Sequence, residues 1–124
     1  MILACGTLLA SCQSKEQQIL GKWNMHLVSN DGTDVTEEHN PENNRWIDFK
    51  DNGAYISDGD PYGKNSGKWS FNEEGFLFLD SDADEGDDSY WEVDISKNKM
   101  VWKGAVFEFT KTFSLEYRRA EDPT

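Results

Sequence analysis

The sequence predicts an all-β fold, a small antiparallel up-and-down (meander) barrel of about eight strands. No segment shows sustained helical periodicity, whereas apolar and polar residues alternate along most of the chain. Turn-forming residues separate these alternating runs at short intervals. Aromatic residues make up 13% of the chain and include five Trp. Such residues are enriched in strands and fill a core with large rings, so all three observations favour a β protein.

The expected strands lie at residues 22–28, 45–50, 54–57, 67–71, 76–79, 90–95, 100–103 and 113–119. Asp51-Asn52-Gly53 gives the clearest hairpin signal, because Asn and Gly adopt positive φ at low cost. We expect a further short strand within residues 104–111, with Phe107 and Phe109 on one face. In the polar loop at residues 31–44 we expect one helical turn, capped by Thr36.

Most of the expected connections join strands that follow each other in sequence. A meander of this kind leaves two unpaired edges, and closing it into a barrel removes both. The barrel is therefore favoured, while a two-sheet β-sandwich stays open as the alternative.

The first twelve residues carry no charged side chain, and the chain turns polar from Gln13 onward. A short apolar run that ends in small residues is typical of a secretory signal and is too short to span a bilayer. Leu9-Ala10-Ser11-Cys12 resembles the lipobox of bacterial lipoproteins, which implies lipidation of Cys12. We therefore expect a truncated signal segment at 1–12, a polar tether at 13–19 and a folded domain at 20–124. The expected location is the cell envelope, on the periplasmic or surface side of the outer membrane.

Two features of this leader differ from the usual pattern. No Lys or Arg precedes the apolar run, so we expect the natural start to lie upstream. Cys5 also fits a lipobox loosely, but it lies too near the amino end. The alternative is that residues 1–12 form a buried apolar strand with two free thiols. If the leader interpretation holds, the mature domain has no cysteine beyond the anchor, which excludes disulfides and Cys-based zinc sites.

The chain has 24 acidic and 12 basic residues and a net charge of −12. A surface this negative repels phosphate backbones, which argues against nucleic-acid binding. It would attract a basic protein partner, although a solvated surface on an exported protein is the simpler explanation.

Leu20-Gly21-Lys22-Trp23 resembles the Gly-x-Trp motif that opens the first strand of lipocalins. The resemblance implies that Trp23 packs across the closed end of a barrel, beneath an Arg from the last strand. Alternation from Leu115 and Tyr117 puts Arg119 on the inward face, so we expect Arg119 rather than Arg118 in this role. The overall plan is similar to lipocalin-like lipoproteins of Bacteroidetes, with Phe49 to Gly53 as a Phe-x-x-x-Gly hairpin and Gly67-Lys68-Trp69 as a second Gly-x-Trp.

An eight-stranded barrel either holds one small ligand or is filled by its own side chains. Both outcomes remain open from the sequence. The inward residues expected from alternation are Met25, Leu27, Phe49, Tyr55, Trp69, Phe71, Trp91, Val93, Met100 and Trp102. All of these except Val93 and Met100 are candidates for contact with a ligand.

We expect neither catalysis nor a cofactor. His26, expected on an outward face, and His39, in a polar loop, have no neighbouring ligands at metal-binding spacing. The acidic loop at residues 80–88 begins with Asp-x-Asp-x-Asp, as calcium loops do. However, Glu85 stands where the glycine belongs and Trp91 stands where the bidentate Glu belongs, so we expect a solvated loop and no metal. No nucleophile has a recognisable base motif.

Two functions are therefore weighed. The first is a lipid-anchored lipocalin-like domain that binds a small apolar or amphiphilic ligand and meets the membrane through its anchor only. The second is an acidic protein-binding module with a filled barrel, such as an inhibitor or immunity protein for a basic partner. Acidic side chains clustered beside one rim would favour the second hypothesis, and an even spread would favour mere solubility.

Overall fold

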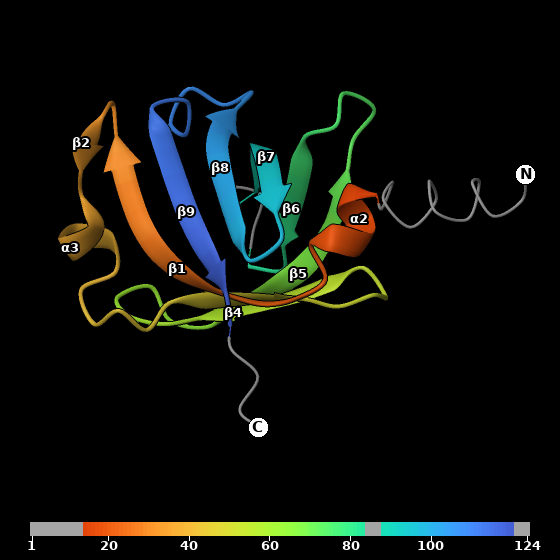
Figure 1. The fold of residues 1–124 in the computed structure, drawn as a ribbon, viewed down its shortest axis with the longest axis horizontal. Helices are drawn as coiled ribbons and strands as arrows, with labels where there is room; N and C mark the ends of the chain where they lie inside the picture. The colour runs from red at the N-terminus through yellow and green to blue at the C-terminus, as the bar shows by residue number, and fades with distance from the viewer. Residues whose placement is uncertain (1–13, 84–87, 121–124) are drawn as a thin grey trace, which may run out of the picture.

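The computed structural model describes residues 14–83 and 88–120, which form a closed antiparallel barrel (Figure 1). The expected signal segment, including Cys5 and the expected lipidation site Cys12, lies outside the described residues. None of the helices in the described part is long and apolar enough to cross a membrane. The elements are α2 (Lys15–Gln18), β1 (Gly21–Asn30), β2 (Thr33–Asp34), α3 (Thr36–His39), β3 (Trp46–Phe49), β4 (Ala54–Asp58), β5 (Asn65–Phe71), β6 (Leu77–Ser81), β7 (Ser89–Ser96), β8 (Lys99–Ala105) and β9 (Phe113–Arg119).

The strands follow the sequence order around the barrel, with the short β2 attached only to the end of β1. Pairing of β1 with β9, from Trp23 opposite Arg119 to Asn30 opposite Phe113, closes the sheet. Eight strands, β1 and β3 to β9, therefore form the barrel wall. The meander barrel is confirmed, and the β-sandwich alternative is wrong, because a single sheet whose two ends pair has no second layer.

A bulge in β1 changes which side chains face the interior. Met25 lies opposite Tyr117 and Leu27 opposite Glu116, so His26 is an extra residue in this strand. Since side chains alternate strictly along a strand, one extra residue reverses the phase of everything after it. Val28 is accordingly buried, whereas Leu27 is 42% exposed. The expectation that Leu27 faces the interior is wrong.

One end of the barrel is closed by the segment that precedes β1. The Ser14 side chain accepts a hydrogen bond from the Gln17 N–H and caps α2. Lys15 Nζ donates to the Val93 carbonyl at 2.8 Å, and Ile19 is fully buried. Residues 14–19, which the sequence placed in a tether, thus pack on the barrel, and the folded domain begins before residue 20.

The same end holds the pair formed by Trp23 and Arg119. The Trp23 indole N–H donates to the Ile19 carbonyl at 2.8 Å, and the Arg119 guanidinium lies over its ring. Gly21 begins β1 with a φ of +105°, and a side chain there would stand 3.5 Å from Arg119 Nη1. Arg118 is exposed and pairs instead with Glu116 on the outer face.

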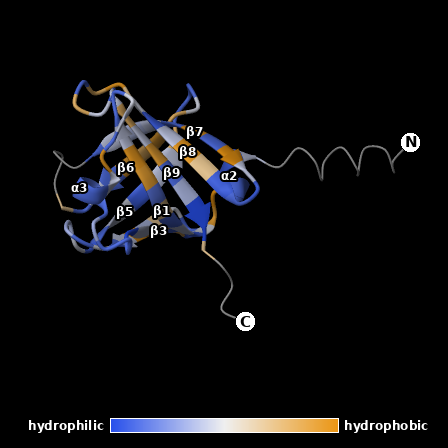
Figure 2. Ribbon diagram, turned by 60° about the vertical axis from the view of Figure 1, so that its left-hand side comes forward, coloured by the Kyte–Doolittle hydropathy of each residue, from blue (hydrophilic) through white to orange (hydrophobic). Residues whose placement is uncertain are grey.

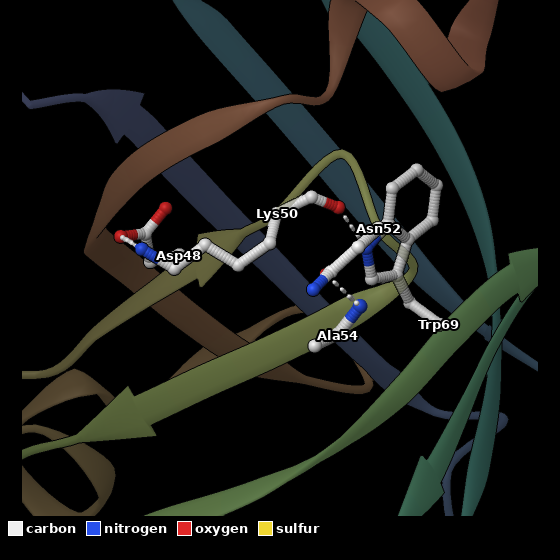
Figure 3. Close-up of polar contacts among 5 residues, drawn as sticks. All are labelled: Asp48, Lys50, Asn52, Ala54 and Trp69. Atoms are coloured by element: carbon white, nitrogen blue, oxygen red, sulfur yellow. Dashed lines mark hydrogen bonds and ion pairs between the residues drawn. The ribbon is translucent and has the colours of Figure 1, made fainter.

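The hairpin between β3 and β4 lies at this closed end and is shown in Figure 3. The Asn52 side chain accepts a hydrogen bond from the Ala54 N–H at 3.1 Å, and Gly53 has a φ of +88°. The Trp69 indole N–H donates to the Lys50 carbonyl at 3.0 Å. The expected Asp-Asn-Gly turn is therefore confirmed, and Trp69 ties β5 to it.

Two local expectations differ from the structure. The helical turn α3 forms, but its N-cap residue is Val35. The Thr36 hydroxyl instead accepts a hydrogen bond from the Val28 N–H at 3.0 Å, and this bond ties α3 to the barrel wall. Residues 106–112 form turns rather than a strand, with the Phe107 and Phe109 rings stacked 5.5 Å apart. Val106 has a φ of +67°, which breaks the extended backbone that a strand requires.

A candidate ligand pocket at the open end of the barrel

The half of the barrel away from Trp23 contains a cavity of about 520 Å³. This volume falls within the range of small-molecule sites, which spans about 300–1,000 Å³. Apolar residues run along the barrel strands between hydrophilic stretches (Figure 2), and the inward members of that alternation form the cavity wall. The interior lining comes from seven strands, β1, β3, β4 and β6 to β9, and consists of Met25, Ile47, Tyr55, Leu79, Trp91, Trp102, Leu115 and Tyr117.

The closed half has no comparable space. Its largest side chains are fully or almost fully buried against one another: Ile19, Trp23, Phe49, Leu77, Val93 and Met100. The two alternatives from the sequence, a filled core and a pocket, therefore each describe one half of the same barrel.

Four of the eight sequence candidates line the cavity: Met25, Tyr55, Trp91 and Trp102. Phe49 belongs to the filled half, and Trp69 and Phe71 are half-buried with their edges packed at the closed end. Leu27 lies on the outer face.

Several residues that line the cavity were not among the candidates from the sequence, and the most important of these are Arg45 and Tyr117. The signal that could have found Arg45 is alternation in β3. Ile47 and Phe49 are buried, and counting back by two from them reaches Arg45. For Tyr117 the signal is the alternation in β9, which places Tyr117 and Arg119 on the same inward face.

The polar groups on the β4–β6 side of the cavity bond to one another. Asn65 Nδ2 donates to the Tyr55 hydroxyl at 3.3 Å, and the Ser81 hydroxyl donates to Asn65 Oδ1 at 3.0 Å. Burial raises the pKa of Tyr55; the hydrogen bonds from Ser81 and Asn65 oppose this, and the charge of Asp82 adds to it. This phenol therefore stays neutral, and its neighbours have their hydrogen-bonding partners.

Trp102 differs from the other tryptophans of the barrel in the hydrogen bonding of its indole N–H. Trp23, Trp69 and Trp91 each donate their indole N–H to a carbonyl or hydroxyl oxygen. Trp102 is only 2% exposed, and its Nε1 is the one buried side-chain N or O in the described part of the chain without a hydrogen-bond partner. Leaving a buried donor without an acceptor lowers the stability of the fold by about 1–3 kcal/mol.

Arg45 borders the cavity at the start of β3. Its Nη1 donates to the His39 carbonyl at 2.9 Å, and its guanidinium lies 4.6 Å from the centre of the Tyr62 ring. Gly59 fits closely against it, since a Cβ there would stand 2.5 Å from Arg45 Cα. The backbone of the β4–β5 loop therefore fixes where the guanidinium lies.

Tyr117 lies between Arg45 and Trp102. Burial raises the pKa of Tyr117 to about 12, against the opposing effect of the positive charge of Arg45. The Tyr117 and Trp102 ring centres are 4.7 Å apart. One wall of the cavity thus carries a cation and a neutral phenol next to the Trp102 ring.

Two loops meet over the mouth beside this wall. His39 Nδ1 and the Tyr62 hydroxyl are 2.8 Å apart, and the His39 ring packs edge-on against Phe113 at 5.4 Å. Tyr62 itself is 58% exposed. The contact between α3 and the β4–β5 loop therefore lies beside the cavity mouth and is itself exposed to solvent.

The acidic loop between β6 and β7 lies at the same end of the barrel. The Ser81 N–H donates to Asp88 Oδ1 at 2.9 Å, and the Ser66 hydroxyl donates to Asp82 at 3.0 Å. Residues 84–87, which include Glu85, lie outside the described residues. Among the residues that are described, no group of three or more His, Cys, Asp or Glu side chains could hold a metal ion.

Comparison with solved structures supports the fold. The chain is similar to the crystal structure of a DUF4847 family protein from Bacteroides vulgatus ATCC 8482, with a TM-score of 0.60 and 12% identity. The match covers 87% of this chain and 98% of that one. No family model and no curated protein matches the sequence. At this level of identity the likeness establishes a shared barrel and nothing about function.

Proposed function

We propose that this protein is a lipid-anchored, lipocalin-like domain that binds a small apolar or amphiphilic ligand inside its barrel. The observation that carries the proposal is the cavity of about 520 Å³, whose wall includes Trp91, Trp102 and Tyr117. A core built only for stability would fill this half as it fills the other, because interiors are packed as densely as organic crystals.

The lipocalin-like and lipid-anchored parts of the proposal rest on the sequence. The Gly-x-Trp at Gly21 and Trp23, together with Arg119, resembles the lipocalin barrel end, and Cys12 lies in a lipobox-like run. Because α2 lies at the closed end (Figure 1), an anchor at Cys12, two residues before Ser14, would leave the cavity mouth directed away from the membrane.

The charge distribution bears on the acidic protein-binding alternative. Described acidic residues gather in loops at the open end, such as Glu37, Asp60 and Asp82, whereas the hairpins at the closed end hold fewer, such as Asp51 and Glu73. Acidic side chains gathered beside one rim favour a basic protein partner at that rim as a second candidate function.

Intrinsic fluorescence tests the proposal directly. All strand pairings that close the barrel lie within residues 14–120, so a soluble protein of residues 13–124 retains the domain. Titration with fatty acids, tetrapyrroles and other apolar compounds should give a saturable change at one ligand per chain, because Trp91 and Trp102 line the cavity. No change with any compound, confirmed by calorimetry, would contradict the proposal.

A further inference from the structure

The hydrogen-bonding groups that face the cavity are not balanced between donors and acceptors. Two hydroxyls near the wall already accept hydrogen bonds: the Tyr55 hydroxyl accepts from Asn65, and the Ser89 hydroxyl accepts from Trp91. The Asp58 carboxylate at the edge of the cavity accepts from the Gly59 N–H. On the donor side, Arg45 and Tyr117 both line the cavity. A ligand that complements this wall must therefore bring acceptors.

Arg45 adds a positive charge to the donor side. The chain carries a net charge of −12, yet none of the ion pairs within the described residues involves Arg45. Of its five N–H groups, one at Nη1 is used by the His39 carbonyl. A guanidinium presents its remaining donors in a planar fork that matches a carboxylate, so an anionic group is the natural partner.

Tyr117 supplies a second donor next to this charge. Its ring is 5% exposed, and burial raises its pKa to about 12, which keeps the hydroxyl protonated at any physiological pH. The neutral phenol can therefore donate a hydrogen bond to an anion and carries no charge that would repel it.

The remaining lining is apolar on the inside of the barrel, while Ser57, Asp58 and Asn65 border the cavity as polar residues. Met25, Leu79 and Leu115 surround the space beyond the wall of donors, together with the face of Trp91. A ligand that fills the cavity must accordingly have an apolar body as well as an acceptor group. Lys64 lies on the rim and adds positive charge at the entrance.

We infer that the cavity is built for a carboxylic acid with an apolar body, and that its carboxylate lies between Arg45 and the Tyr117 hydroxyl. This inference rests on the proposed function, because it names the ligand class of the same cavity. It goes further in assigning the charge of the ligand and the residues that select it.

The test compares two ligands of equal chain length, decanoate and decanol, by fluorescence titration and calorimetry on the soluble protein. The wild-type protein should bind decanoate about tenfold or more tightly than decanol, because hydrogen bonds to charged groups contribute more than neutral ones. In Arg45→Gln decanoate affinity should fall more than decanol affinity, so the preference should shrink to about threefold or less.

Arg118→Gln is the matched control. It removes the same charge from the chain, but Arg118 pairs with Glu116 on the outer face, so the preference should persist. If Arg45→Gln fails to fold, because the bond to the His39 carbonyl is lost, Tyr117→Phe provides the second variant. Removing only its hydroxyl should lower decanoate affinity more than decanol affinity, so the preference for decanoate should again shrink.

The outcomes separate the two proposals. Equal binding of decanol and decanoate, or an undiminished preference in Arg45→Gln and in Tyr117→Phe, would overturn the inference while leaving the binding function intact. Failure of both ligands and of every other apolar compound would remove the binding function and, with it, the inference.

Discussion

The Arg119 guanidinium lies 4.1 Å from the centre of the Trp23 indole ring, and the two residues also face each other across the β1–β9 pairing. Arg119 donates to three carbonyls, those of Gln18, Leu20 and Lys97, at 2.9 to 3.2 Å. One side chain thus joins the entry segment, the seam of the barrel and the β7–β8 turn. Burial lowers the pKa of Arg119, but a guanidinium remains charged at any physiological pH.

Replacing Arg119 with Ala should destabilise the domain by about 2 kcal/mol, the combined effect of a lost cation–π contact and three hydrogen bonds. The free energy of unfolding in urea measures this loss. Arg118→Ala is the control, and we expect it to cost about 0.5 kcal/mol or less, because its ion pair with Glu116 is exposed. Equal losses in the two variants would show that the position over Trp23 has no special role.

The Gly-x-Trp motif at Gly67 has a steric explanation. A Cβ at Gly67 would stand 2.1 Å from the Asp80 carbonyl oxygen and 2.9 Å from the Tyr55 ring. Gly67→Ala should therefore cost about 2 kcal/mol or more, since overpacking forces the strands β5 and β6 apart. Ser70→Ala, at an exposed position of the same strand, should be nearly neutral. A Gly67→Ala protein as stable as wild type in thermal unfolding would disprove this account.

Filling the cavity should abolish ligand binding without unfolding the barrel. Leu79 lines the cavity, so Leu79→Trp places extra volume where a ligand would sit. We expect about a tenfold or greater loss of affinity for decanol, because the displaced space is no longer available. Leu27→Trp makes the same exchange on the outer face beyond the β1 bulge, and it should bind as wild type does. If Leu27→Trp blocked binding instead, the bulge would be misplaced.

The Tyr117 pKa of about 12 predicts an alkaline loss of stability. Between about pH 10 and 12 the unfolded chain has lost the phenol proton while the folded chain keeps it, so the free energy of unfolding falls as pH rises. Relative to neutral pH the loss approaches about 2–3 kcal/mol once both states are ionised. Tyr117→Phe should show a shallower decline over this range in urea unfolding. Parallel pH curves for the two proteins would contradict the prediction.

Much of the fold follows from local pattern. Alternation located most of the strands, and Asp51-Asn52-Gly53 identified a hairpin because positive φ is inexpensive for Asn and Gly. The inward phase of β9 likewise singled out Arg119 over Arg118. These features depend on residues close in sequence, which is why a reading of the chain alone reached them.

Other features depend on contacts between distant residues. The extra residue at His26 is set by how β1 meets β9, so strict alternation misplaced Leu27. The expected strand at 104–111 did not form, since residue 106 adopts a positive φ that no pattern of polarity signals.

The sequence by itself determined most of the strands, their order and inward aromatic residues such as Trp91 and Trp102, because alternation and turn chemistry are local properties. Only the tertiary structure decided where the barrel is filled and where it is hollow. That division arises because Ile19 and Trp23 plug one end, whereas Arg45, Tyr117 and Trp102 come from three separate strands or strand ends and meet only when β1 pairs with β9. Closure of the sheet therefore created the candidate site.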